Sequence, residues 1–346
     1  YKYLQCNSNK KVALIEIGRG LGGRSSTRIS KKYLGWELNH GSPNLNIRSK
    51  NNNLVKNFIK DLLKKRLIRF DDSDLINLGN NSKLGSIQNL EFMHGVSYVS
   101  NSSMKELSKR IITSNKLGNQ IDFFFETLIN KLDFKNNTWY LTSKNGEKFK
   151  SHYLICTSNL LLHKRSMEIL NTNQIPIRNA IPKNKDKKID ELLNYLDRQS
   201  YIPRLTFLIY TKPNYRYKDF YSKKFRYFNL NKDLESKFKF ERIIFQLQKN
   251  NKLGIVVHSK SLNLIEDYLN GKNKDKFKQK ILQNFNDIFL DNSYINQLSG
   301  NEDVSIMRWR ASQPFGDSVP LSLQFSRKYN IGFCGDWFQG DGFGRI

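Results

Sequence analysis

The chain has few of the residues that build disulfide frameworks and metal centres. Its 346 residues include three cysteines, Cys6, Cys156 and Cys334, which lie far apart and form no C-x-x-C pair. The five histidines show no metal-ligand spacing either. The sequence therefore argues against a disulfide scaffold and against a zinc site. This cysteine usage agrees best with a reducing, cytoplasmic setting.

Long apolar runs are also missing from the sequence. No stretch approaches the roughly 20 residues needed to cross a bilayer, so we expect no membrane span. No secretory signal is visible at Tyr1. The apolar fraction of 38% and the aromatic fraction of 12% nevertheless suffice for a packed core. The length allows two domains.

Acidic residues are scarce, with 31 against 58 basic residues and a formal net charge of +27. Such a balance is typical of nucleic-acid-binding proteins. However, 40 of the basic residues are lysine and 18 are arginine, and asparagine also occurs 40 times. A genome rich in A/T codons would produce this bias, and the basic residues are spread along the chain. A nucleic-acid surface would instead show clustered arginine with interleaved aromatic residues. We expect a solvated lysine-rich surface and no specific nucleic-acid partner.

Hydrophobic periodicity predicts alternating strands and helices. Lys11–Ile17, KVALIEI, reads as a buried parallel strand, and the apolar stretch 153–157 reads as another. Residues 171–200 are polar and are expected to form an exposed crossing between domains. The other expected strands are Asp122–Leu132, Thr138–Ser143, Leu205–Tyr210, Arg242–Gln248, Gly254–His258 and Asn330–Cys334, and the expected helices are Leu54–Leu67, Asn101–Thr113 and Lys274–Phe289.

Glycines follow the first expected strand in a pattern that fits two interpretations. Gly18, Gly20 and Gly23 match G-x-G-x-x-G, and Glu37 lies about where a ribose-binding acid would be sought. As the first loop of an NAD(P)-binding fold, however, this segment must open a helix. The following residues, 24–32, contain a single apolar side chain and no helical stripe. This favours the second interpretation, in which Lys11–Ile17 is the second strand of a dinucleotide-binding fold.

In the second interpretation each residue type has a physical role. Glu16 ends the strand, where a carboxylate can accept both hydroxyl groups of an adenosine ribose. Gly18, Gly20, Gly22 and Gly23 let the backbone pass close to a pyrophosphate. Arg24 can pair with the phosphate charge.

Four segments together resemble the flavin amine oxidases and renalase-like proteins. They are VALIEIGRGLGGRSSTR at 12–28, Asn39-His40-Gly41, Met307-Arg308-Trp309-Arg310-Ala311 with Pro314, and Gly332–Phe338, which contains Gly-Asp-Trp-Phe. In the second of these, asparagine stands where the family has aspartate. The resemblance is strong at both ends of the chain and weak for about 165–300.

The resemblance implies a non-covalently bound FAD. It assigns Glu16 to the adenosine ribose, Arg24 to the pyrophosphate and Asp336 to the ribitol or phosphate. His40 and His258 become the candidate catalytic residues, although a structural histidine is the alternative for His258. Trp309 and Trp337 either line the flavin pocket or belong to the core, and Cys334 is interpreted as a buried strand residue. The full candidate cofactor-binding set is Glu16, Gly18, Gly20, Gly22, Gly23, Arg24, Ile129, Gly335 and Asp336.

The expected fold is α/β, a dinucleotide (FAD)-binding fold of the glutathione-reductase type with an inserted mixed-sheet substrate domain. Residues 1–50, 92–165 and 301–346 are assigned to the FAD-binding domain, and 51–91 and 166–300 to the substrate domain. The family's first strand and G-x-G-x-x-G loop should precede Lys11, and Tyr1–Lys10 is too short for them. Gly342–Ile346 stops where the closing helix would begin. We therefore expect a chain truncated at both ends.

The expected activity is that of an FAD-dependent oxidoreductase. The small-molecule substrate, an amine or a dihydronicotinamide-like donor, would pass a hydride to flavin N5. Two alternatives stay open at this point. One is an NAD(P)-binding oxidoreductase that uses Gly18–Gly23 as its first loop. The other is an inactive remnant that acts as a binding module for polyanions.

Overall fold

The chain divides into two compact units, each built from segments distant in sequence. The computed structural model describes residues 4, 7, 9–30, 35–47, 53–79, 84–89, 95–211, 225–247, 253–271, 273–291 and 295–338. Cys6 and the C-terminal segment 342–346 lie outside these residues. Unit 1 comprises Tyr1–Gly23, Ile111–Tyr201 and Gln313–Gly342, and unit 2 comprises Arg24–Arg110, Ile202–Ser312 and Phe343–Ile346.

These units differ from the domains expected from the sequence. The compact units place 24–50, 92–110 and 301–312 with the large sheet of unit 2, and 166–201 with unit 1. The sequence-based division groups residues by expected ligand, whereas the units group them by packing. The assignment of cofactor and substrate roles to these segments stays a prediction.

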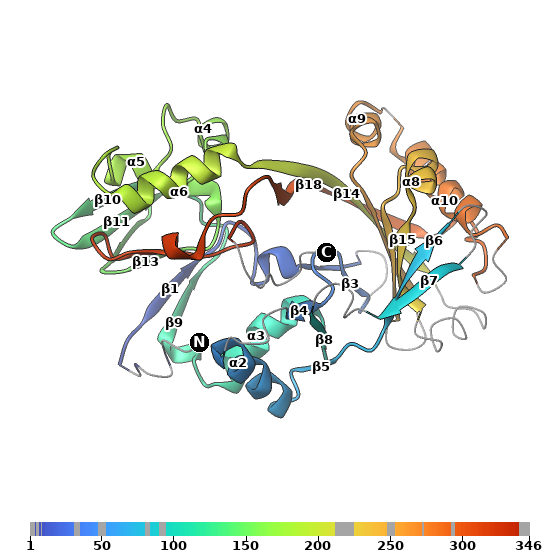
Figure 1. Cartoon of the computed structure of the whole chain (residues 1–346), viewed down its shortest axis with the longest axis horizontal. Coiled ribbons are helices and arrows are strands. Elements are labelled where there is room, and N and C mark those ends of the chain that lie inside the picture. Colours follow the sequence, from blue (N-terminus) through green and yellow to red (C-terminus); the bar gives the residue numbers. More distant parts are fainter. Residues whose placement is uncertain are drawn as a thin grey trace. The chain divides into compact units, whose positions relative to one another are not determined.

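Unit 1 contains two parallel strand pairs, as expected for a dinucleotide-binding fold (Figure 1). β1 (Val12–Ile15) pairs in parallel with β9 (Ile121–Phe124). β13 (Leu154–Cys156) pairs in parallel with β20 (Ile331–Phe333), and β19 (Phe325–Ser326) runs antiparallel to β20. A separate antiparallel sheet has the order β10 (Ile129–Lys135), β11 (Thr138–Ser143) and β12 (Lys148–Ser151).

Three expectations about unit 1 were wrong in detail. The single strand expected at Asp122–Leu132 is two strands, β9 and β10, because the chain turns at Glu126, whose φ is 53°. β1 is half-buried rather than buried. In β13 only Cys156 is buried, and Ile155 is 68% exposed, since one face of this short sheet lacks cover among the described residues.

Residues 171–200 are not an exposed crossing. They contain α5 (Ile177–Ala180) and α6 (Lys187–Arg198). Asp186 caps α6 by accepting from the backbone N–H groups of Lys188 and Ile189. Helical spacing then brings four side chains onto one buried face, which packs into the core with residues of β10 and β11. Figure 1 shows α6 next to these strands. These side chains are Ile189, Leu192, Leu193 and Leu196.

Unit 2 is built on a seven-stranded mixed sheet. Its order is β18-β14-β17-β16-β15-β6-β7. The strands are β6 (Asp74–Leu78), β7 (Leu84–Asn89), β14 (Ser200–Thr211), β15 (Phe225–Leu230), β16 (Arg242–Leu247), β17 (Leu253–Ser259) and β18 (Asp303–Phe315). This sheet confirms the expected inserted mixed-sheet domain.

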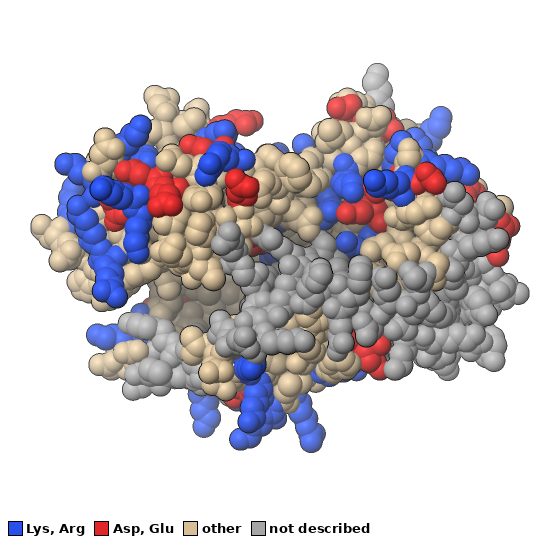
Figure 2. Space-filling model, viewed as in Figure 1, with Lys and Arg blue, Asp and Glu red and all other residues tan. Residues whose placement is uncertain are grey.

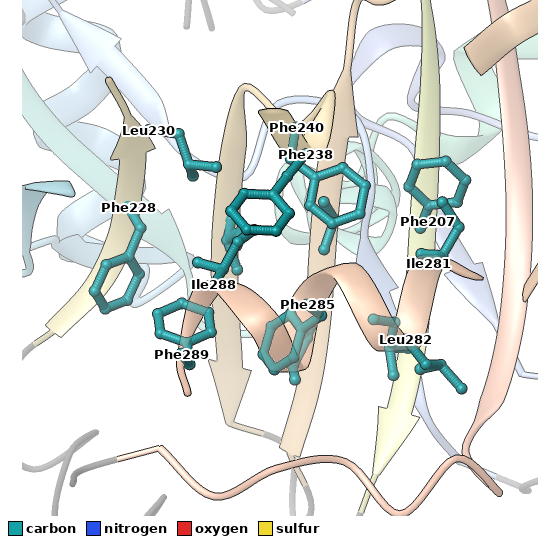
Figure 3. Close-up of a cluster of buried hydrophobic side chains, with 14 of the residues drawn as sticks. Phe207, Phe228, Leu230, Phe238, Phe240, Ile281, Leu282, Phe285, Ile288 and Phe289 are labelled. Carbon is teal, nitrogen blue, oxygen red and sulfur yellow. The ribbon is translucent and has the colours of Figure 1, made fainter. Parts of the chain in front are cut away.

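Each face of this sheet carries its own apolar cluster. α8 (Lys232–Phe238), α9 (Leu262–Asn270) and α10 (Lys274–Ile288) cover one face. There Phe285 of α10 packs against Phe245 of β16, and Ile281 of α10 lies beside Phe207 of β14 (Figure 3). The opposite face holds Trp36 and Leu38 against Leu208, Ile244 and Val256.

The remaining helices of unit 2 agree with those expected from the sequence. α2 (Asn53–Lys64) and α3 (Met104–Ser114) form as expected, and Ser103 Oγ accepts from the Glu106 N–H at the start of α3. A small antiparallel sheet has the order β4 (Leu45–Ile47), β8 (Val96–Ser100) and β5 (Ile68–Phe70). β2 (Thr27–Ile29) pairs with β3 (Glu37–Asn39).

Candidate active site

Glu16 lies at the carboxyl end of the parallel strand β1, as expected. Its backbone N–H donates to Phe124 O at 2.8 Å and continues the ladder with β9. Its carboxylate Oε1 accepts from the Gly18 N–H at 2.7 Å, so the side chain holds the start of the glycine segment. Oε2 has no hydrogen-bond partner within the described part of the chain. One carboxylate oxygen thus holds the Gly18 N–H, and the other can accept a hydrogen bond from a ribose hydroxyl.

The glycine segment forms a turn and not the start of a helix. Gly22 and Gly23 have φ values of 120° and 47°, which other residues rarely adopt. A three-residue 3₁₀ turn at Gly23–Ser25 leads directly into β2, and Glu37 lies in the antiparallel strand β3. The NAD(P) interpretation requires an α-helix after Gly23 that presents its N-terminus to a phosphate, and the described residues 24–30 contain a 3₁₀ turn and a strand instead.

Arg24 joins an N-terminal segment of unit 2 to the C-terminal strand β18 by hydrogen bonds. Its Nη1 donates to Ala311 O at 2.9 Å and also to Ser312 O. Both acceptors lie on β18, directly after the Arg-Trp-Arg segment. The motif at 12–28 and the motif at 307–311 thus meet through this side chain, although they lie almost a chain length apart in sequence.

The Asn39-His40-Gly41 segment packs directly on the backbone of Arg24 and Ser26. A Cβ at Gly41 would overlap the Arg24 carbonyl oxygen, so only glycine allows this approach. The His40 and Gly41 N–H groups both donate to Ser26 O, at 3.2 and 3.3 Å. Asn39 and Gln246 exchange hydrogen bonds of 2.9 and 2.8 Å, which join the segment to the large sheet.

His40 is a buried, neutral histidine. Its side chain is 5% exposed, and its ring centroid lies 5.3 Å from that of the half-buried Trp309. Burial, aided by the charge of Arg28, lowers the pKa of His40 to about 4. Its Nδ1 has no hydrogen-bond partner among the described residues. At neutral pH this ring therefore carries no charge.

His258 has a protein partner in the large sheet. Its Nδ1 and Thr206 Oγ1 lie 3.1 Å apart. Burial, together with the charges of Arg242 and Arg204, holds the pKa of His258 well below its usual range. These contacts favour the structural interpretation, and a catalytic role for His258 stays a prediction.

The second carboxylate, Asp336, follows β20 in unit 1. Gly335 precedes it, and a Cβ at Gly335 would overlap the indole of Trp337. Trp337 belongs to the core, yet its buried Nε1 lacks a hydrogen-bond partner within the described residues. Ile129 is also a buried core residue. Cys334 is exposed rather than buried, because the chain leaves the sheet at Phe333.

Sequence reasoning missed Gln199, which fixes the Asp336–Trp337 turn. Its side-chain Nε2 donates to Asp317 O at 2.7 Å and to Trp337 O at 3.2 Å. His163 Nε2 lies 3.2 Å from Gln199 O and holds the backbone in place. A glutamine in a polar stretch gives no sequence signal, because its partners are carbonyl groups more than a hundred residues away.

Each unit holds residues whose chemistry suits a nucleotide-type ligand. Unit 1 offers a carboxylate after each of two parallel strands, a glycine turn and an orphaned indole N–H. Unit 2 offers the half-buried guanidinium of Arg24, the residue directly after Gly23. Carboxylates suit ribose hydroxyl groups, and close backbone with a guanidinium suits phosphates. Among the described residues, no three potential metal ligands gather.

Comparison with solved structures identifies the fold. No protein-family model matches the sequence, and no curated protein matches it. Solved structures do match, including one described as a protoporphyrinogen oxidase from Exiguobacterium sp. 255-15. It has 10% identity and a TM-score of 0.61, over 98% of this chain and 91% of that one. Putrescine oxidase bound to putrescine matches at 9% identity and a TM-score of 0.59, over 99% and 91%.

An oxidoreductase from Methanosarcina mazei is similar to the same degree. It has 10% identity and a TM-score of 0.58, over 98% of this chain and 92% of that one. At these identities the likeness shows the fold alone. It confirms the expected α/β dinucleotide-binding fold with an inserted sheet domain. Within the described residues, the helices are all too short or too polar to cross a bilayer.

Proposed function

We propose that this protein is an FAD-dependent oxidoreductase of the amine-oxidase type, similar to the renalase-like proteins. One observation carries the proposal. Glu16 ends the parallel strand β1 and Asp336 follows the parallel strand β20, in a fold shared with several oxidases. In open parallel sheets, ligands bind beyond the carboxyl ends of the strands.

Each residue of the candidate site has a binding role in this proposal. Glu16 Oε2 accepts from the adenosine ribose while Oε1 keeps the Gly18 N–H. Gly22 and Gly23 let the backbone approach the pyrophosphate, and Arg24 pairs with its charge. Asp336 accepts from the ribitol, in a turn held by Gln199. FAD is bound without a covalent link.

Bound flavin would supply the redox chemistry by accepting a hydride, which is two electrons and a proton, at N5 from an amine or a dihydronicotinamide-like donor. Dioxygen or another acceptor would then take up the two electrons. The protein orients the donor and excludes water from it. The neutral ring of His40 beside Trp309 can hold a donor by a hydrogen bond without adding charge.

Glu16→Gln tests the cofactor assignment. Glutamine keeps an acceptor for the Gly18 N–H, so the fold should be preserved, but it removes the negative charge that strengthens the ribose hydrogen bond. Hydrogen bonds to charged groups contribute on the order of 1.5–3 kcal/mol, so FAD affinity in a flavin titration should fall about tenfold or more. Arg24→Ala should weaken FAD binding by a similar factor.

Glu126→Gln is the matched control, since this carboxylate is exposed and lies on the neighbouring turn after β9, where the Glu126 N–H donates to Gly18 O. It should leave the FAD affinity unchanged. If Glu16→Gln binds FAD as tightly as the wild type does, the carboxylate of Glu16 serves only to hold the Gly18 N–H. If the wild-type protein itself takes up no flavin, the proposed function fails.

A further inference from the structure

A row of polar side chains crosses one end of the seven-stranded sheet, on the face that carries Trp36. Thr206 of β14 lies opposite His258 of β17, and Arg242 of β16 lies opposite His258 on its other side. Asn229 of β15 lies opposite Arg242. Each of the four stands two positions along its strand from a member of the apolar cluster on this face, so their side chains point to the same side of the sheet.

Hydrogen bonds within this row use up its acceptor atoms. Asn229 Oδ1 accepts from Arg242 Nε at 3.1 Å. Thr206 Oγ1 lies 3.1 Å from Nδ1 of His258, whose ring is neutral because burial and two arginine charges hold its pKa well below the usual range. With the Thr206 hydroxyl donating to Nδ1, the proton of the ring is on Nε2. The side chains of the row then present donors to their surroundings.

The nitrogens at the outer ends of three of these side chains have no partner among the described residues. They are Arg242 Nη1 and Nη2, His258 Nε2 and Asn229 Nδ2. The three side chains are partly exposed, and none of the four nitrogens is fully buried. Directly opposite residues of antiparallel strands have Cβ atoms about 4.5–5.5 Å apart, so these donors are within reach of one small molecule.

The charges around the row leave one cation unmatched. Arg204 pairs with Glu241 at 2.8 Å, and Lys260 pairs with Glu235 at 3.1 Å. Arg242 forms no ion pair within the described part of the chain. Burial lowers the pKa of Arg242 to about 10, even with the charge of Glu241 nearby. A guanidinium in such surroundings gains from an anion that pairs with it.

The donors and the charge together define the anion. A guanidinium holds the two oxygens of a carboxylate with two parallel hydrogen bonds, and a carboxylate carries the single negative charge that one arginine balances. A phosphate monoester carries about −1.5 to −2 and would be left partly unbalanced. We propose that Arg242, together with His258 and Asn229, binds the carboxylate of a small organic acid.

This site shares no residue with the set proposed to bind FAD. Its use as a substrate site rests on the proposed function. His40, which is proposed to hold the donor, lies close enough to His258 for its charge to lower the pKa of that ring. The molecule that is oxidised would then be a donor that bears a carboxylate, rather than a plain amine.

Arg242→Gln tests the site by removing the charge and the two-pronged donor. Binding of propionate to the full chain is measured by ligand-observed NMR without added flavin, and circular dichroism checks that each variant is folded. The affinity should fall about tenfold or more in Arg242→Gln, as expected for hydrogen bonds to a charged group. Arg242→Lys keeps the charge and should lose less. Propionamide, which has the same shape without the charge, should bind the wild type at least tenfold more weakly than propionate does.

Arg69→Gln is the matched control, because Arg69 is an exposed arginine of unit 2 and its replacement removes the same charge. It should leave propionate affinity unchanged. The inference is overturned by a wild type that does not bind propionate, by equal losses in Arg242→Gln and Arg69→Gln, or by tighter binding of inorganic phosphate than of propionate. A protein that binds propionate through Arg242 but takes up no flavin would keep this site and reject the proposed function. Flavin uptake without propionate binding would do the reverse.

Discussion

At the scale of single residues, His40 couples the stability of the protein to pH. Its pKa falls from 6.5 to about 4 on folding, because burial and Arg28 disfavour the charged ring. The unfolded chain therefore binds a proton at a higher pH than the folded chain does. The stabilising contribution is complete above pH 6.5 and is lost as the pH falls from 6.5 to about 4.

This shift makes a measurable prediction. The difference between 6.5 and about 4 corresponds to about 3 kcal/mol. The free energy of unfolding should fall by up to that amount as the pH is lowered over this range, and His40→Asn should reduce the slope. His258, whose pKa is also lowered, contributes in the same direction, so some slope will persist. His152→Asn, at an exposed position, controls for the loss of a histidine. An unchanged slope in His40→Asn would show that His40 is not buried in solution.

At the scale of secondary-structure elements, α6 decides whether residues 171–200 are folded. Leu192 is fully buried on its inner face, whereas Glu191 points outward. Leu192→Ala should lower the free energy of unfolding by about 2–5 kcal/mol, through lost apolar contact and the cavity left behind. Chemical denaturation gives this value directly. Glu191→Ala should change it little, and equal effects in the two variants would mean that the helix is not packed.

At the scale of the whole molecule, charge sets the behaviour toward polyanions. Basic side chains occur over both units on the face in Figure 2, with acidic side chains among them. With a net charge of +27, we predict weak binding to duplex DNA at low salt that does not depend on sequence. Because this binding releases counterions, it should weaken steeply as salt is raised. FAD affinity should depend far less on salt. Tight, sequence-selective DNA binding at physiological salt would instead support a binding module.

Much of the fold could be predicted because its signals are local. The apolar run before Glu16 predicted β1, and the glycines without a following apolar stripe predicted a turn rather than a helix. Asn136 and Asn137 have φ values of 50° and 56°, as a two-residue hairpin requires, and they connect β10 to β11. The amphipathic spacing in 187–198 was equally readable, but the surrounding polar residues and prolines obscured it.

The sequence by itself determined the parallel strand ending at Glu16, the inserted sheet domain and the flavoenzyme resemblance, since each depends on neighbouring residues. Only the tertiary structure decided which distant groups meet. It brought Arg24 to the carbonyl groups of β18, Gln199 to Trp337 O and Gly41 to the backbone of Arg24. It also left the side chain of Asn44 buried without a hydrogen-bond partner among the described residues. These contacts join residues far apart in sequence, and burial and hydrogen-bond satisfaction depend on the packing of the whole unit, so no local pattern records them.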